Sequence, residues 1–101
     1  MPATCTILYP RSAEVNLDYY LNHHMRLASK LFDTSILISW EVFALPTDAP
    51  YSVQADITWA SIEACEAALG SEKGQLMHDD VKNYSREKPV VLFRESIGRS
   101  H

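Results

Sequence analysis

Several kinds of residue are scarce in this chain of 101 amino acids, and each scarcity excludes a class of function. Glycine occurs only three times and forms no glycine-rich phosphate loop, so a nucleotide-binding loop is not expected. The nine Lys and Arg residues are scattered and the net charge is −4, so the basic stripe of a nucleic-acid-binding protein is missing. The longest apolar stretches, such as Val90-Val91-Leu92-Phe93, are far too short to span a bilayer, so no membrane partner is expected.

Cysteine is scarce as well, and its spacing excludes the usual cysteine sites. Cys5 falls in a predicted strand and Cys65 in a predicted helix, and neither belongs to a C-x-x-C pair. Both are therefore predicted to be small buried apolar residues without a disulfide. No basic start followed by an apolar segment opens the chain, so the expected location is the cytoplasm.

A metal site is weakly supported, because the candidate ligands are poorly arranged. The candidates are His23, His24, His78 and Asp80. Adjacent histidines on a helix project about 100° apart, so His23 and His24 do not easily bind one ion. No H-E-x-x-H, paired-cysteine or EF-hand pattern is present, and no metal or other cofactor is expected.

What the chain does contain is the composition of one globular domain, with 47% hydrophobic and 22% charged residues. Apolar residues alternate cleanly along 51–59 and recur at steps of three and four along 17–32. Asn16 or Asp18 is a candidate cap of the first helix, and Ser61 and Ser71 are candidate caps of the later ones. The predicted strands cover 3–9, 35–45, 51–59 and 89–97; the predicted helices cover 17–32, 61–69 and 71–84.

The order strand–helix–strand–strand–helix–strand predicts a ferredoxin-like α+β fold. Its four-stranded sheet is antiparallel and carries both helical regions on one face. The strand over 35–45 is apolar on both alternations for much of its length, which is typical of a strand covered on both sides. Helices supply one cover, and the other would have to come from a second subunit. The sequence therefore predicts a homodimer.

One polar pair stands on the apolar face of the first helix. Tyr20 and His24 lie four residues apart, so their side chains are neighbours on the face expected to meet the sheet. His24 is either a core histidine satisfied by Tyr20 or a backbone carbonyl, or a titratable group that lines a cavity. In the second case its pKa suits it to act as an acid or base near neutral pH.

A second group of polar residues lies in the last helical region. Asp80 is placed to share an inward face with Tyr84, and a pair between Asp80 and His24 would orient the imidazole. The alternative is a solvated acidic turn formed by His78, Asp79 and Asp80. The aromatic residues are either core or the walls of an apolar pocket.

Four segments, taken in order, resemble the EthD family. Tyr20 precedes His24 by four residues, as the aromatic precedes the histidine in the family's helix motif, although Arg26 stands where the family has a proline that would bend the helix. The similar segments are Tyr19–Leu27; Ser39-Trp40-Glu41-Val42; Thr58-Trp59 through Leu69; and Asp80-Val81-Lys82-Asn83-Tyr84-Ser85 followed by Lys88-Pro89-Val90.

The resemblance implies a dimeric α/β barrel, in which two ferredoxin-like sheets pack face to face, and a link to the breakdown of small organic compounds. Related barrels include cofactor-free oxygenases, isomerases and lyases. The expected function is a cofactor-free enzyme with an apolar small-molecule ligand, using His24 as general acid or base, Tyr20 as hydrogen-bond donor and Asp80 to orient the ring. The alternative is a non-catalytic binding or accessory protein of a degradation pathway. The expected substrate-binding residues are Trp40, Trp59, His78 and Tyr84.

Overall fold

The computed structural model describes residues 1–100 and contains one four-stranded sheet. All paired strands are antiparallel, in the order β2-β3-β1-β4. This is the ferredoxin-like order, so the predicted α+β class is confirmed. The strands are β1 (Ala3–Pro10), β2 (Leu37–Ala44), β3 (Tyr51–Trp59) and β4 (Val90–Arg94); the helical elements are η1 (Arg11–Ala13), α1 (Leu17–Tyr19), η2 (Tyr20–His24), α2 (Met25–Leu31), α3 (Ile62–Leu69), α4 (Glu72–Asp80) and η3 (Val81–Asn83).

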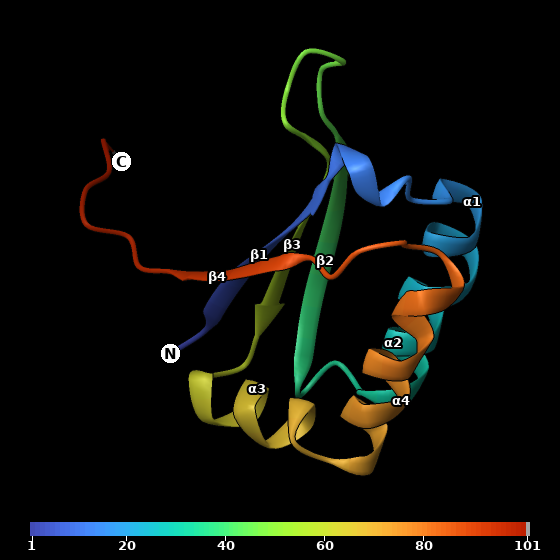
Figure 1. Ribbon diagram of the computed structural model, residues 1–101. Coiled ribbons are helices and arrows are strands. Elements are labelled where there is room, and N and C mark those ends of the chain that lie inside the picture. Colours follow the sequence, from blue (N-terminus) through green and yellow to red (C-terminus); the bar gives the residue numbers. More distant parts are fainter. Residues whose placement is uncertain (101) are drawn as a thin grey trace.

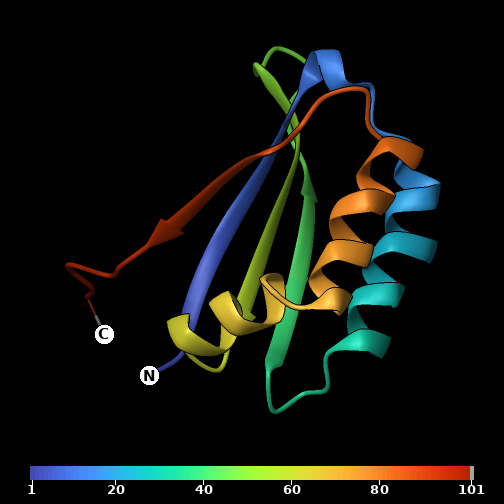
Figure 2. The same cartoon turned by 60° about the horizontal axis from the view of Figure 1, so that its bottom comes forward.

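The helices form one layer over the sheet. The continuous segment α1–η2–α2 and helix α4 lie side by side on one face, and α3 crosses near one end of the sheet (Figures 1 and 2). The core lies between these layers. Val53, Ala55, Ile57 and Trp59 of β3 are buried beneath the helices, and this confirms the alternation predicted for 51–59.

Side-chain caps start three of the helical segments. The Asn16 carboxamide oxygen accepts from the Tyr19 amide, so Asn16 and not Asp18 caps the first helix. The predicted caps Ser61 and Ser71 are confirmed, since their hydroxyls accept from the amides three residues later. Such a cap stabilises a helix by about 1 kcal/mol. The start of α4 also requires Gly74, because a Cβ there would lie 2.3 Å from the Leu69 carbonyl oxygen.

The first helix departs from the regular α-helix predicted over 17–32. It contains a π turn at Tyr20–His24, in which the Met25 amide donates to the Tyr20 carbonyl oxygen five residues earlier. Regular α-helix resumes over Met25–Leu31. The helical path therefore gains one extra residue in its middle.

The two edge strands carry exposed apolar side chains. Ile38 and Phe43 of β2 are exposed, and all five residues of β4 are exposed. The last strand is also shorter than predicted, ending at Arg94. The predicted second cover for β2 is not supplied by the described residues of one chain, so the face-to-face dimer stays a prediction.

Among residues 1–100, no helix combines the length and the apolar character needed to cross a membrane.

Candidate functional site

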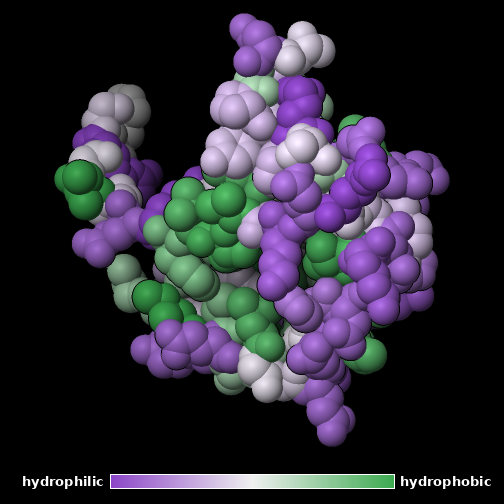
Figure 3. All heavy atoms as spheres, in the orientation of Figure 1, coloured by the Kyte–Doolittle hydropathy of each residue, from purple (hydrophilic) through white to green (hydrophobic). Residues whose placement is uncertain are grey.

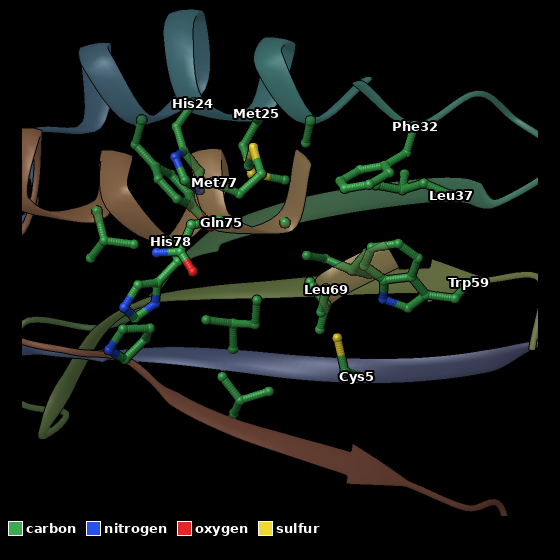
Figure 4. Close-up of a pocket in the computed structure, with 18 of the residues that line it drawn as sticks. Cys5, His24, Met25, Phe32, Leu37, Trp59, Leu69, Gln75, Met77 and His78 are labelled. Atoms are coloured by element: carbon green, nitrogen blue, oxygen red, sulfur yellow. The ribbon is translucent and has the colours of Figure 1, made fainter. Parts of the chain in front are cut away.

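A cavity of about 420 Å³ lies between the sheet and the helices (Figure 4). Its volume falls in the range of small-molecule sites. Inward-facing residues of β1 and β3 form its floor, while α2 and α4 close its sides, and most of the lining is apolar. Among the lining residues, the polar rings of Tyr9, Tyr20 and His24 pack together.

His24 is held from behind by Asp80. The His24 Nδ1 and Asp80 Oδ2 atoms lie 2.8 Å apart, and the two residues are 7% and 8% exposed. The second carboxylate oxygen, Oδ1, accepts from the Tyr19 hydroxyl at 2.6 Å and from Asn83 Nδ2 at 2.9 Å. Three donors therefore satisfy a nearly buried carboxylate, which holds the imidazole in one orientation.

The other nitrogen of His24 continues the network through two tyrosines. The Tyr84 hydroxyl lies 3.2 Å from His24 Nε2, and the Tyr9 hydroxyl lies 2.6 Å from that of Tyr84. An ionised carboxylate only accepts, so Nδ1 carries the hydrogen of the neutral ring and donates it to Asp80. His24 Nε2 is then an acceptor, with Tyr84 donating to it and Tyr9 donating to Tyr84.

The electrostatics favour a neutral imidazole beside an ionised carboxylate. Burial lowers the pKa of His24 and outweighs the opposing effect of Asp80. Burial raises the pKa of Asp80, but hydrogen bonds from Tyr19, Asn83 and His24 outweigh it and leave that pKa below its usual value. Burial also raises the pKa of Tyr9 and Tyr84, so both hydroxyls stay protonated.

The π turn is what brings Tyr19 to the same carboxylate as His24. On a regular α-helix, residues five apart point about 140° away from each other. The π turn spreads its residues over a wider turn, so Tyr19 and His24 both reach Asp80. The sequence analysis did not name Tyr19 as a site residue because it assumed a regular helix. Tyr19 precedes His23 by four residues, as Tyr20 precedes His24, but this spacing does not reveal a π turn. In the structure the Tyr19 and His23 rings are tilted by 30°, and Tyr20 stacks on His24.

Tyr20 contacts His24 through its ring. The two ring centroids are 5.6 Å apart and the planes are 16° from parallel. The sequence analysis expected Tyr20 to donate a hydrogen bond to His24 or to substrate, but the donor to His24 is Tyr84. Tyr20 stays available to the cavity, which it lines.

The expected substrate-binding residues divide into two pairs. Trp59 and His78 line the cavity, and His78 also borders an adjoining depression of about 470 Å³, which places it at the rim. Trp40 and Tyr84 do not line it. The Trp40 indole donates to the Ser29 hydroxyl at 2.9 Å, between β2 and α2, because an edge strand places it beside the cavity and not over it.

Tyr9 and Asn83 complete the network and were not assigned a role from the sequence. Tyr9 follows Cys5 and Ile7 on the inward alternation of β1, which was a signal for a cavity residue. Asn83 follows Asp80 by three residues, within the segment that resembles the EthD family. That spacing lets it donate to the carboxylate across one turn.

Metal and thiol chemistry have little support at this site. Within the described part of the chain, no three His, Cys, Asp or Glu side chains gather as a metal site would require. His23 lies at the periphery, with its Nδ1 3.8 Å from Asp80 Oδ2. Cys5 and Cys65 are buried free thiols.

Comparison with known proteins identifies solved structures that share this fold. No protein-family model and no curated protein matches this chain. Among solved structures, an EthD-like protein from Ralstonia eutropha JMP134 superposes with a TM-score of 0.80 at 21% identity, covering 98% of this chain and 96% of that one. An ethyl tert-butyl ether degradation (EthD) family protein from Bacillus halodurans C-125 gives 0.76 at 15% identity, covering 96% and 100%. A cofactor-independent oxygenase from Streptomyces nogalater gives 0.73 at 11% identity, covering 98% and 96%.

These matches show that the chain has the fold of EthD-like proteins over nearly its whole length. The same fold carries a cofactor-independent oxygenase. A shared fold does not assign a reaction, so the reaction has to be argued from the site.

Proposed function

We propose that this chain is a member of the EthD family and a cofactor-free enzyme that acts on a largely apolar small organic molecule. Two observations support membership: the fold shared with EthD-like proteins and the family-like segments around His24 and Asp80. The apolar cavity supports the class of substrate.

The observation that carries the proposal is the continuous chain of hydrogen bonds from the cavity to Asp80. Tyr9 lines the cavity and bonds to Tyr84, Tyr84 bonds to His24, and His24 bonds to Asp80. A neutral His24 with an acceptor nitrogen at the inner end of this chain is a general base that takes its proton through hydroxyl groups.

The proposed step is a proton transfer. An acidic C–H or O–H bond of the substrate breaks, its electron pair stays on the substrate, and its proton passes to the Tyr9 oxygen. Tyr9 gives its own proton to Tyr84, and Tyr84 gives its proton to His24 Nε2. Both tyrosines end neutral, and Asp80 stabilises the imidazolium. The substrate anion then reacts with dioxygen, is reprotonated at another atom, or expels a leaving group, as in an oxygenase, an isomerase or a lyase.

A non-catalytic binding or accessory protein of a degradation pathway is the second candidate. The observation in its favour is that both nitrogens of His24 are already hydrogen-bonded within the protein. Such a network also serves to fix the shape of a binding pocket, with no proton transfer at all.

Deuterium exchange separates the two candidates. Desoxybenzoin is a neutral two-ring ketone with an acidic methylene group, and its exchange in D₂O is followed by mass spectrometry. We expect the protein to accelerate exchange above the buffer rate and His24→Leu to remove the acceleration. Binding of desoxybenzoin without accelerated exchange would favour the second candidate. Exchange that survives in folded His24→Leu would rule out His24 as the base.

We also propose that the chain works as a homodimer. The support is the row of exposed apolar residues on β4, from Val90 to Phe93, together with Ile38 and Phe43 on β2. Apolar side chains gather in the region that β4 crosses (Figure 3), and exposed edge strands of this kind are usually covered. Stable dimers often bury more than about 2,000 Å². Sedimentation equilibrium at micromolar concentration should give twice the chain mass; a single 11.4 kDa species would contradict the dimer.

A further inference from the structure

The end of the cavity away from His24 contains a buried hydrogen-bond donor with no partner. Trp59 is the last residue of β3 and is only 3% exposed. Its indole Nε1 is fully buried and makes no hydrogen bond, and it is the only side-chain nitrogen or oxygen in this state among residues 1–100. Buried donors are almost always paired, so an orphan in a cavity wall calls for an explanation.

Cys5 is a polar neighbour of the indole, but it does not give the N–H group a strong acceptor. Cys5 lies on the adjacent strand and its sulfur faces the same end of the cavity as the Trp59 nitrogen (Figure 4). The Trp59 N–H group favours the charged form of Cys5 and lowers the pKa of its thiol, but burial raises that pKa by more, so the sulfur stays protonated. A thiol sulfur is a weak acceptor. The indole N–H therefore lacks a strong partner within the chain.

The charge of the lining restricts what that partner is. Among the described residues that line the cavity there is no Lys, Arg, Asp or Glu. An ionised ligand would lose its hydration there without gaining an opposite charge, which is strongly unfavourable. The ligand that enters is therefore neutral, and its acceptor for Trp59 is an uncharged oxygen such as a carbonyl.

The sheet register sets the length of the ligand. Tyr9 pairs with Val53, and Trp59 lies six residues further along β3. At about 3.4 Å per residue, the two ends of the site are about 20 Å apart at the level of the backbone. His24 and Trp59 are accordingly seen at opposite ends in Figure 4. The side chains of Tyr9 and Trp59 both extend into the cavity, so the gap between them is shorter than the separation of their backbones. A molecule of two linked rings spans this gap.

We propose that Trp59 Nε1 donates a hydrogen bond to the carbonyl oxygen of a neutral, elongated, conjugated ligand whose acidic hydroxyl lies at the Tyr9–His24 end. This inference rests on the proposed function and names its substrate class. When the hydroxyl O–H bond breaks, its proton moves through Tyr9 and Tyr84 to His24. The electron pair delocalises through the conjugated system onto the carbonyl oxygen. Trp59 then faces the developing negative charge, where a positioned donor is most effective.

A matched pair of probes tests the donor. Para-hydroxychalcone has the phenol and the conjugated carbonyl, whereas para-hydroxystilbene keeps the phenol and both rings but has no carbonyl. By isothermal titration calorimetry, we expect the unmodified protein to bind the chalcone about tenfold more tightly, as one added hydrogen bond predicts. Trp59→Phe should abolish this preference and leave stilbene binding within about twofold. Trp40→Phe is the control, because Trp40 lies outside the cavity, and it should keep the preference.

A second measurement needs no substitution at Trp59. The chain has two tryptophans, so a ¹⁵N-labelled sample gives two indole N–H signals, which Trp40→Phe assigns. The chalcone should shift the Trp59 signal strongly downfield, and the stilbene should not. Equal affinity for both probes, absence of chalcone binding, or an unmoved Trp59 signal would each overturn the proposal.

A third variant keeps this proposal distinguishable from the proposed function. His24→Leu removes the base but leaves Trp59 in place, so it should retain the chalcone preference. If His24→Leu loses exchange activity but the unmodified protein has no chalcone preference, the base is supported and the Trp59 donor is rejected. If the preference holds in a protein that accelerates no exchange, the Trp59 donor is supported and the base is rejected.

Discussion

The two ends of the cavity differ in whether their polar groups have hydrogen-bond partners. At the His24 end, a nearly buried carboxylate satisfies His24, Tyr19 and Asn83 at once. At the Trp59 end, a buried donor faces apolar walls with no acceptor of its own. Satisfied networks fix geometry, whereas unsatisfied groups select what binds. Under the two proposals, this pocket separates the positioning of a base from the recognition of a ligand along the length of one strand.

The largest effect is expected from removing His24, the proposed base. His24→Leu keeps much of the side-chain volume but has no proton acceptor, so proton transfer to a bound substrate should fall by about 10²–10⁴-fold. Folding should be retained, because Tyr19 and Asn83 still donate to Asp80. Leucine can also pack against the Tyr20 and Tyr84 rings. Exchange kinetics together with a melting curve test this. A His24→Leu protein with full activity would mean that His24 serves only to pack the core.

The second largest effect is expected at Asp80, whose carboxylate accepts the hydrogen bonds of the network. Asp80→Ala leaves three donors without an acceptor, so the free energy of unfolding should fall by about 3 kcal/mol. Asp80→Asn preserves the shape and should reduce turnover more than ligand binding. The matched control is Asp79→Ala at the exposed neighbouring position, where urea denaturation should reveal a change below about 0.5 kcal/mol. Equal losses at both positions would contradict a special role for Asp80.

The pH dependence of stability should report the state of His24. Its folded pKa lies below the ordinary value of 6.5, mainly because of burial. Below pH 6.5 the unfolded chain therefore binds a proton that the folded chain does not. The contribution of His24 to stability is complete above that pH and is lost as pH falls towards the folded pKa. Asp80 stays ionised through this window, since its pKa lies below 3.8.

Urea unfolding between pH 7.5 and 5.5 checks this window. His23 is the other histidine beside His24 and disfavours the charged form of His24, so it is replaced by Gln in both proteins compared. His24→Leu should flatten the decline in stability with acidification. An equally steep decline in both proteins would place the titrating group elsewhere.

The smallest effect is expected for Tyr19, at the margin of the network. Tyr19→Phe removes one hydrogen bond to a charged carboxylate at a half-exposed position, which should lower the free energy of unfolding only slightly. Tyr51→Phe is a suitable comparison, because the Tyr51 hydroxyl makes no hydrogen bond with the described residues. Thermal melts of the two variants should differ by a few degrees. Identical melts would mean that Tyr19 adds nothing to holding Asp80.

The sheet and the helix starts were predictable because each depends on local chemistry. The alternation of β3 reflects one buried face, and Ser61 and Ser71 cap helices through their own hydroxyls. Strand ends were less predictable. The last strand stops at Arg94, which pairs with Thr4 near the start of β1, and the alternation of the sequence does not mark this end.

Within the site, the structure brings together His24 and Asp80, which the sequence analysis had already paired. Tyr19 could not be predicted, because a π turn is a shift in backbone hydrogen bonding that leaves the apolar pattern unchanged. Trp40 and Trp59 look alike in sequence, yet only Trp59 lines the cavity. The difference between the two tryptophans lies in the tertiary structure, because β3 is central in the sheet and β2 is at its edge.

The π turn also explains how this helix holds one residue more than its packing requires. Tyr20 is buried at the start of the turn, and Met25 and Ala28 are buried on the α-helix that follows it. Five residues of a π turn advance the chain by nearly the same rotation as four residues of an α-helix, so the segments on either side keep their orientation. Deleting exposed Leu21 would place Tyr19 four residues before His24, on one face of an unbroken α-helix. The site would then tolerate the loss of one residue here, whereas a further insertion would rotate the rest of the helix by about 100°.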